Sequence, residues 1–325
     1  MTTPPPAEYP VDIDIPDIEP YLAGNTRIRG VTCFDSGKAG PHVMISAVVH
    51  GNEPCGAVAL DWLFRNDVRP SRGKLSLGFM NIEAYQAFDR NNPAATRWID
   101  EDFNRLWDLS TLDGDRQSSE LSRAREVRPW METVDILLDL HSMQRCQIPL
   151  MMAGPLEKGR DLGKRLGTPE HIVTDAGHAA GRRMRDFEGF RDPTSPKNAL
   201  LYEAGQHWEA ISGPRSIEVA LRFLRVLEVV DQEFGAAFLN DRSLPARQHV
   251  IEVTGPVTIA SEEFTFAEAF QGMEVLPNAG TLIGHDGDKP VVTPYDDCVL
   301  IMPSRRLWKG QTAVRLGRFV GKADI

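Results

Sequence analysis

The sequence contains few cysteines and no long apolar run. Its four cysteines lie far apart and form no Cys-x-x-Cys pair: Cys33, Cys55, Cys146 and Cys298. This spacing argues against a disulfide framework and is typical of reduced thiols in a cytoplasmic protein. No apolar run reaches the ~18 residues of a membrane span, and residues 1–6 lack the basic and apolar stretches of a secretory signal. We therefore expect a cytoplasmic protein without a membrane span.

Basic residues are also scarce. The chain has 36 Lys and Arg against 46 Asp and Glu, which gives a formal net charge of −10. Without a block of basic residues, this balance argues against nucleic acids and anionic membrane surfaces as partners. A small anionic substrate would need a local cluster of arginines to overcome the field of the whole chain.

Hydrophobic patterning predicts an α/β sheet with helices on both faces. Residues 1–24, rich in proline and acid, are expected to form an extended arm, followed by a domain over 25–244. We expect strands over 27–34, 43–49, 75–80, 134–140 and 199–203, and helices over 53–64, 118–132 and 216–234. After about residue 245, short β-like runs separated by Gly and Pro predict a small β-rich domain over 245–325.

Three residues form a candidate metal site. His50 and Glu53 are three positions apart after the apolar run 43–49, and His141 follows the apolar run 134–140. The carboxyl ends of buried strands meet at one edge of such a sheet, so these side chains are expected to converge there. Two imidazoles and one carboxylate are a common ligand set of catalytic zinc. Asp139 precedes His141 by two positions, and is either an outer partner of that ring or a structural residue.

Two further segments have either a functional or an ordinary structural interpretation. The segment from Arg97 to Arg105, which includes Asn104, is a solvated charged loop or a site where arginine forks bind a carboxylate. Glu203 ends an apolar strand, where a carboxylate is costly unless it is paired or catalytic. Burial would raise its pKa toward the range that suits a general base, although it could instead pair with one of the arginines.

Together, four segments resemble the succinylglutamate desuccinylase/aspartoacylase family, a branch of the zinc carboxypeptidase-like hydrolases. They are His50 to Glu53, Arg97 to Arg105, Asp139 to His141 and Glu203 to Gly205, and their order and spacing agree across residues 43–205. The resemblance implies a mixed sheet flanked by helices, with a smaller C-terminal β domain. A homodimer is an expectation from the same resemblance.

The resemblance also implies roles for the metal-site residues. One Zn²⁺ per chain would be held by His50, Glu53 and His141, although such ligands also accept other divalent ions. Glu203 matches the general base and acid, and Arg97 matches the group that polarises the scissile carbonyl. The implied chemistry is the attack of zinc-activated water on an amide carbonyl.

Asn104 and Arg105 match residues that bind a substrate carboxylate. The implied substrate is an anionic N-acyl amino acid, and the arginines favour conjugates of aspartate or glutamate. Three alternatives stay open: a metallocarboxypeptidase-like peptidase, a deacetylase of a small N-acetylated diamino acid, and a binding protein without catalysis.

The rest of the substrate pocket is not determined by these motifs. Arg185, Arg191 and Tyr295 are candidates for a further substrate contact, and His207 either lines the pocket or belongs to a loop. Bulky side chains near the motifs either accommodate a large acyl group or belong to the core: Trp98, Trp107, Met143, Met151 and Met152.

Overall fold

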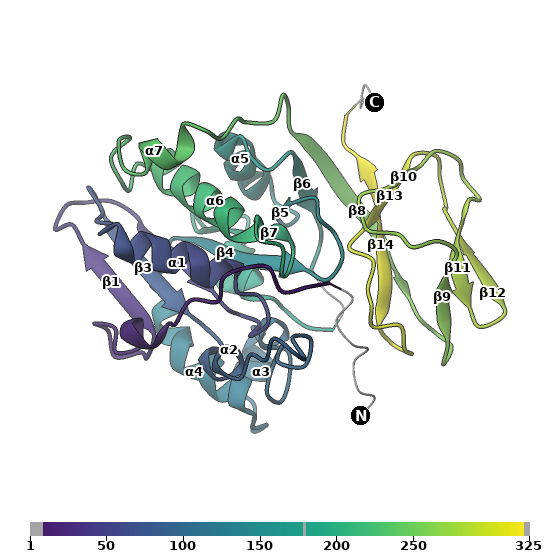
Figure 1. Ribbon diagram of the computed structural model, residues 1–325, viewed down its shortest axis with the longest axis horizontal. Helices are drawn as coiled ribbons and strands as arrows, with labels where there is room; N and C mark the ends of the chain where they lie inside the picture. Colours follow the sequence, from purple (N-terminus) through teal and green to yellow (C-terminus); the bar gives the residue numbers. More distant parts are fainter. Residues whose placement is uncertain (1–8, 178–179, 322–325) are drawn as a thin grey trace.

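Figure 1 shows a computed structural model of the protein, in which residues 9–177 and 180–321 are described. Within these residues an 11-stranded mixed sheet has the order β1-β3-β2-β4-β7-β5-β6-β8-β14-β13-β10. Its strands are β1 (Val31–Asp35), β2 (His42–Ala47), β3 (Lys74–Phe79), β4 (Ile136–Met143), β5 (Leu150–Met152), β6 (His171–Thr174), β7 (Asn198–Gln206), β8 (His249–Thr258), β10 (Val275–Leu276), β13 (Cys298–Ile301) and β14 (Thr312–Phe319). A smaller antiparallel sheet contains β12 (Lys289–Val292), β11 (Leu282–Asp286) and β9 (Phe264–Phe266).

Helices cover both faces of the large sheet (Figure 1). On one face lie α1 (Cys55–Arg65), α5 (Glu157–Leu166), α6 (Ser212–Val226) and α7 (Ala236–Leu239), and on the other lie α3 (Leu109–Leu112) and α4 (Ser119–Met131). The short helix α2 (Ile82–Gln86) follows β3, and its Ile82 and Tyr85 pack in the same hydrophobic cluster as α1 and α6. Short 3-10 turns are η1 (Glu19–Tyr21), η2 (Phe103–Arg105), η3 (Met184–Asp186) and η4 (Glu188–Phe190). In the described part, no helix has the length and apolar character that a membrane span requires.

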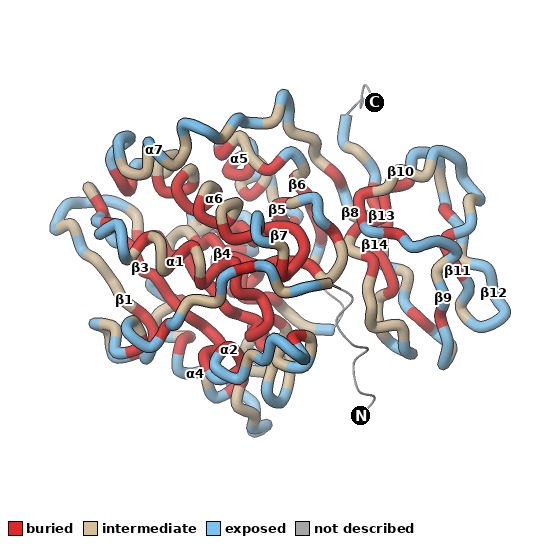
Figure 2. Tube along the Cα trace, in the orientation of Figure 1, coloured by how far each residue is buried: buried red, intermediate tan, exposed pale blue. Residues whose placement is uncertain are grey.

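The central strands are buried on both faces, as their continuous apolar runs predict. Every residue of β2 is buried, and Figure 2 shows buried segments in the middle of the large sheet around β4 and β7. Successive side chains point to opposite faces, so Val43 and Ile45 pack in one hydrophobic cluster with α1 and α6, and Met44 packs in another with α4. The parallel strands β3, β2, β4 and β7 therefore form a rigid platform whose carboxyl ends lie together.

The predicted helix over 216–234 is wrong at its C-terminal end, because α6 stops at Val226. Glu228 adopts a left-handed conformation with φ 55°, and the Val229 amide donates to the Leu224 carbonyl. This pattern is a Schellman-type end, and burial of Val229 against the α6 side of the core stabilises it without the usual glycine. The expected strand over 27–34 also starts later, at Val31.

The C-terminal strands continue the large sheet. Strand β8 pairs in parallel with β6, and β14 pairs with the other edge of β8. The expected mixed α/β fold with a smaller C-terminal β part is confirmed, and the division of the chain at residues 244 and 245 stays a prediction. Of the expected N-terminal arm, residues 1–8 lie outside the described residues; over 9–24, Ile13, Ile18 and Leu22 are buried in the core.

Candidate active site

His50 and Glu53 lie in the connection between β2 and α1. The Glu53 amide donates to the His50 carbonyl at 3.2 Å, which closes a turn between them. Gly51 is required in this turn, because a Cβ atom there would lie 2.2 Å from the Ala84 carbonyl carbon. Glu53 precedes α1 and does not begin it as expected, because the helix starts at Cys55.

His141 lies within β4 and not at its end as expected, since the strand continues to Met143. It is aligned with Glu203 on the neighbouring parallel strand β7. Strand β2 lies on the other side of β4, so the connection that carries His50 and Glu53 reaches the same edge of the sheet.

The three expected metal ligands are buried and converge. One donor atom from each of His50, Glu53 and His141 lies within 4.8 Å of the other two. His50 Nδ1 is 2.8 Å from Glu53 Oε1, and His141 Nδ1 is 2.9 Å from Glu53 Oε2. Two nitrogens and a carboxylate that face one point fit a divalent cation of the zinc type.

Two further carboxylates contact the other ring nitrogens. Asp139 Oδ2 is 2.8 Å from His141 Nε2, and Asp102 Oδ1 is 2.9 Å from His50 Nε2. Such contacts fix the orientation of a ligating imidazole and direct its other nitrogen inward. The outer role considered for Asp139 therefore has a geometric basis, whereas the sequence did not single out Asp102.

Arg97 joins the same cluster. Its guanidinium donates to Glu53 Oε1 at 2.7 Å, and it lies 2.9 Å from His50 Nε2. Burial would lower the pKa of Arg97, but the charges of Asp102 and Glu53 outweigh burial and raise it. Arg97 is therefore a fixed positive charge beside the candidate metal ligands.

Glu203 is buried, with 6% of its surface exposed, and lines the same cavity. Its Oε2 atom has no hydrogen-bond partner in the described part of the chain. Burial raises the pKa of Glu203 to about 8, against the opposing charge of His141. A carboxyl group in this range can both accept and return a proton near neutral pH.

Asn104 and Arg105 lie on η2 at the edge of the site. Asn104 Oδ1 accepts from the Met184 amide at 2.7 Å, so this side chain also anchors the loop. Arg105 Nη1 donates to the Asn104 carbonyl at 2.7 Å, and Nη2 is 4.0 Å from the Asp102 carboxylate. Both side chains line the cavity.

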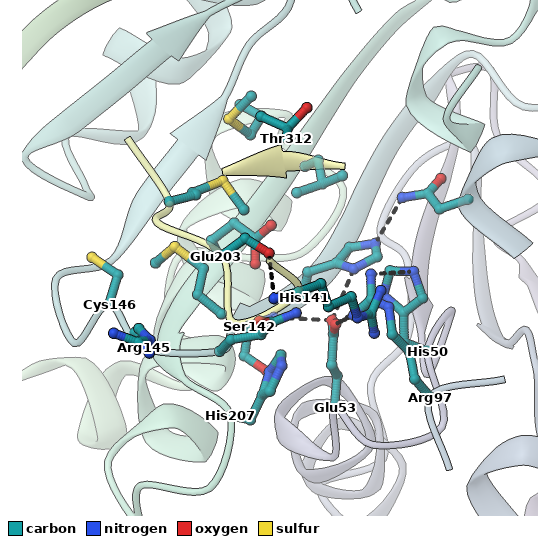
Figure 3. A pocket seen from close by; sticks show the side chains of 18 of the residues that line it. His50, Glu53, Arg97, His141, Ser142, Arg145, Cys146, Glu203, His207 and Thr312 are labelled. Atoms are coloured by element: carbon teal, nitrogen blue, oxygen red, sulfur yellow. Dashed lines mark hydrogen bonds and ion pairs between the residues drawn. The ribbon is translucent and has the colours of Figure 1, made fainter. Parts of the chain in front are cut away.

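The cavity beside these residues is rich in arginine. Figure 3 shows many of the side chains that line it. The arginines among them are Arg97, Arg105, Arg145, Arg183, Arg306 and Arg315. The acidic residues that line it are Glu53 and Glu203, so the acidic chain carries the local positive cluster that an anionic substrate needs.

Residues 39–223 match the family model of the succinylglutamate desuccinylase/aspartoacylase catalytic domain. The chain belongs to this family. It is 33% identical over 107 residues to a probable aspartoacylase from Parasynechococcus marenigrum, a stretch that covers 31% of this chain and 33% of that relative. The chain thus spans about one third of the length of the curated relative it matches.

Solved structures of the family share the fold. A succinylglutamate desuccinylase from Vibrio cholerae superposes with a TM-score of 0.68 at 19% identity, covering 91% of this chain and 88% of that chain. Murine aminoacylase 3 superposes with a TM-score of 0.59 at 19% identity, covering 87% of this chain and 96% of that chain.

Several residues that the sequence suggested as substrate contacts do not line the cavity. Arg185 is buried and donates to the carbonyls of Ala153 and Ala199, whereas Arg191 is exposed. Tyr295 contacts Thr254, and none of these three candidates lines the cavity. Of the bulky side chains, Met143 and Met152 line it, whereas Trp107 and Met151 belong to the core.

The sequence did not assign several other residues to the cavity that line it in the structure. Arg306 and Arg315 come from the C-terminal strands and their connection, and Arg183 precedes η3. His207 also lines the cavity. From the sequence alone, it could be either a pocket residue or a loop residue. No local motif marks these residues, because each reaches the site through long-range folding.

Proposed function

We propose that the protein is a zinc-dependent amidohydrolase that cleaves an anionic N-acyl amino acid to a carboxylic acid and a free amino acid. The observation that supports this proposal best is that the candidate metal ligands, Glu203 and several arginines line one cavity. A buried set of metal donors lies beside a carboxyl group, Glu203, whose Oε2 atom has no partner. The arginines around them suit a substrate that carries carboxylates.

A Zn²⁺ held by His50, Glu53 and His141 would supply a Lewis acid for the amide carbonyl and lower the pKa of water. In the proposed reaction Glu203 takes a proton from the attacking water and later returns it to the leaving amine. The charge of a cation bound there would lower the pKa of Glu203 from about 8, which would favour the carboxylate that this role needs. Arg97 stabilises negative charge on the carbonyl oxygen.

Asn104 and Arg105 are proposed to bind a carboxylate of the amino acid half, which favours aspartate or glutamate conjugates. Arg105 suits this role because its nearest carboxylate, that of Asp102, is 4.0 Å away and leaves donors free for a ligand. A cytoplasmic location and a homodimer remain expectations of the proposal.

The proposal is tested by loading the purified protein with zinc and screening N-acyl amino acids for the release of free amine. The panel spans acetyl, succinyl and aromatic acyl groups on aspartate, glutamate and neutral amino acids, with a short peptide as the substrate of a peptidase. We expect release from a subset of the amino acid conjugates that a chelator abolishes and added zinc restores.

The variant Glu203→Gln should retain zinc and lose about 10²- to 10⁴-fold in turnover, because it can no longer carry the proton. Glu209→Gln is the matched control, since this half-buried glutamate follows β7 without lining the cavity. Near-normal turnover of a zinc-loaded Glu203→Gln would make the assigned role wrong. Failure of the wild-type protein to cleave any conjugate with zinc bound would reject the proposed function.

A further inference from the structure

A second cavity adjoins the catalytic cavity, with which it shares Gln144, His207 and Arg306. Two tryptophans that do not line the catalytic cavity line this one: Trp208 and Trp308. No carboxylate in the described part of the chain lines it. The second cavity therefore lies outside the groups to which the proposed reaction gives a role, and its lining is more aromatic than that of the catalytic cavity.

The two tryptophans differ in how they are held. Trp208 is 2% exposed, and its indole N–H donates to the Asn52 carbonyl at 3.1 Å. The Trp208 carbonyl accepts from the amides of Asp12 and Ile13, both at 2.9 Å, so the residue is fixed on two sides. Trp308 lies in the connection between β13 and β14 and is 43% exposed. A fixed indole and a partly exposed indole around one cavity suit a flat aromatic ligand, because aromatic rings gain from stacked and edge-to-face contacts beyond the area they bury.

Asn52 adds an unused hydrogen-bond acceptor to the second cavity. The residue lines this cavity and is buried, and its Oδ1 atom has no partner among the described residues. The turn around it is fixed, because the Gly51 amide donates to the Arg97 carbonyl at 3.0 Å and the Glu53 amide donates to the His50 carbonyl. A buried acceptor without a donor is costly, so a ligand that supplies an N–H or O–H group would remove this cost.

His207 adds a second unused polar atom. The ring is buried, and its Nε2 has no partner within the described residues. Burial lowers the pKa of His207 to about 3, so the ring is neutral at neutral pH. Its Nδ1 lies 2.8 Å from Ser142 Oγ, a hydroxyl that either donates or accepts, and Nε2 takes the complementary role. Both unpartnered atoms of the second cavity are thus uncharged, which suits a neutral polar group.

The cation that lines both cavities is already stacked on an aromatic ring. The guanidinium carbon of Arg306 lies 4.6 Å from the centre of the Trp98 ring, and Trp98 does not line the second cavity. A guanidinium can also lie over the face of a ligand ring, because the face of an aromatic ring carries partial negative charge. The presence of Arg306 is therefore compatible with an aromatic ligand.

The position of the second cavity indicates which half of the substrate it meets. Asn104 and Arg105, which are proposed to bind the amino acid half, line the catalytic cavity but not the second one. The same holds for Glu203, which protonates the leaving amine in the proposed reaction. Figure 3 shows Glu203 on one side of Ser142 and His207 on the other. The half of the substrate that remains for the second cavity is the acyl group.

We propose that the second cavity is a subsite for a planar aromatic acyl group whose ring carries an N–H or O–H donor. Trp208 and Trp308 contact the ring, and Asn52 Oδ1 accepts from its donor, with His207 Nε2 beside it. The preferred substrates are then amino acids that carry an aromatic acyl group, such as indolylacetyl or hydroxyphenylacetyl. This inference rests on the proposed amide hydrolysis for its orientation, but the presence of the subsite can be measured independently of turnover.

The first test compares kcat/KM for three conjugates of aspartate, which carry an indol-3-ylacetyl, a naphth-1-ylacetyl or an acetyl group. The naphthyl ring is similar to the indole in size and shape but has no donor. We expect both aromatic conjugates to exceed the acetyl conjugate, because their rings bury apolar surface. The indolyl conjugate should exceed the naphthyl conjugate about 3- to 10-fold, because the indole N–H satisfies the acceptor of Asn52.

Variants of the exposed tryptophan then test the aromatic contact. Trp308→Leu should lower the indolylacetyl-to-acetyl ratio about 3- to 10-fold, because leucine keeps apolar bulk but loses the contact between rings. Trp308→Phe keeps an aromatic ring and should retain most of the ratio. Trp62→Leu is the matched control: Trp62 is a partly buried tryptophan that contacts the rings of Phe234 and Phe238 and lines neither cavity.

The second test measures the binding of indole-3-acetate, naphthalene-1-acetate and acetate to the zinc-loaded protein by calorimetry. The wild-type protein should bind indole-3-acetate most tightly and acetate most weakly. Trp308→Leu should weaken the binding of indole-3-acetate about 3- to 10-fold, and Trp62→Leu should leave it unchanged. If no conjugate is cleaved, the proposed function fails while this measurement still decides whether the subsite exists.

Three results would overturn the subsite: a wild-type preference for the acetyl conjugate, equal binding of indole-3-acetate and acetate, or an indolylacetyl-to-acetyl ratio that Trp308→Leu leaves unchanged. Equal kcat/KM for the indolyl and naphthyl conjugates would reject recognition of a ring donor, and with it the proposal as stated. Trp308→Ala gives the same comparison if the leucine variant does not fold. A fall in the ratio for Trp62→Leu as large as for Trp308→Leu would assign the effect to general stability and also reject the subsite.

Discussion

At the scale of single residues, the candidate metal site depends on carboxylates that lie outside the ligand set. Asp139 has no exposed surface, accepts a hydrogen bond from Ser46 Oγ at 2.7 Å and contacts His141 Nε2. Asp102 Oδ1 contacts His50 Nε2. Each imidazole is therefore held between an outer carboxylate and Glu53, which orients the ligands before a cation binds.

Asp139→Asn should weaken zinc binding about 10- to 100-fold, because the neutral amide supports the His141 ring less strongly. The dissociation constant is measured by competition with a chromogenic chelator. Asp135→Asn serves as the control, since this residue precedes β4 and accepts from the His42 amide at the opposite end of the strand. Equal zinc affinity of Asp139→Asn and the wild-type protein would contradict the orienting role.

Glu203 gives the metal-free protein a specific dependence of stability on pH. Burial raises its pKa from 4.5 to about 8, so between these values the unfolded carboxyl group is ionised and the folded one is protonated. The folded state then binds more protons than the unfolded state, and stability falls as pH rises through this window.

Relative to Glu203→Gln, the metal-free wild-type protein should therefore lose thermal stability between pH values of about 5 and about 8. Thermal unfolding of both proteins across this range measures the difference. Zinc loading is the control, because a nearby cation lowers the pKa of Glu203 and should reduce the divergence. Parallel melting curves of the two metal-free proteins would show that the pKa of Glu203 is not raised.

At the scale of elements, the loop that carries Arg97 and Asn104 is organised by α4. The Glu120 carboxylate, in the first turn of this helix, has no exposed surface. It accepts from the backbone amides of residues 99, 100 and 101 at 2.7–3.1 Å, and from Asn81 at 3.0 Å. Three successive loop amides thus share one carboxylate, which fixes the path of the loop into the site.

Glu120→Gln should destabilise the protein by about 1–3 kcal/mol, because the amide group that replaces one oxygen cannot accept from a buried N–H group. Chemical denaturation measures the change. Glu126→Gln on the same helix is the control: its side chain is 43% exposed and pairs with Arg123, so its effect should be about 0–1 kcal/mol. If both variants were equally stable, the anchoring role of Glu120 would be wrong.

The elements differ in how far the sequence predicted them. The buried strands near residues 43–49 and 134–140 were recognisable because uninterrupted apolar runs mark strands covered on both faces. The end of α6 was not, because Glu228 takes a left-handed conformation that no glycine announces. Strands β5 and β6 are only 3 and 4 residues long, which is too short for a periodic signal.

The candidate site likewise contains some residues that the sequence predicted and others that it did not. His50, Glu53, His141 and Glu203 were found because each follows or lies in a buried strand, where a polar residue stands out. Asp102, His207 and Arg306 were not assigned to the site, since their side chains become site residues only through contacts between segments distant in the sequence.

At the scale of the whole molecule, the C-terminal strands share a hydrophobic core with the catalytic part. Ile301 and Val299 on β13 pack in one cluster with Leu201 on β7 and Met152 on β5. The same strands and their connection carry Arg306 and Arg315 to the cavity. We infer that the two parts of the chain fold as one cooperative unit, with the cavity between them.

Ile301→Ala should therefore lower the stability of the entire protein by about 2–5 kcal/mol, because the lost side chain leaves a cavity in the shared core. Far-UV circular dichroism and tryptophan fluorescence should report one coincident transition, shifted to lower denaturant. Val292→Ala on β12 is the control, since this valine is 43% exposed and its truncation should cost less than about 0.5 kcal/mol. If Ile301→Ala instead separated the two signals into distinct transitions, the C-terminal part would be an independent domain, and the boundary near residue 245 would be the limit of a folding unit.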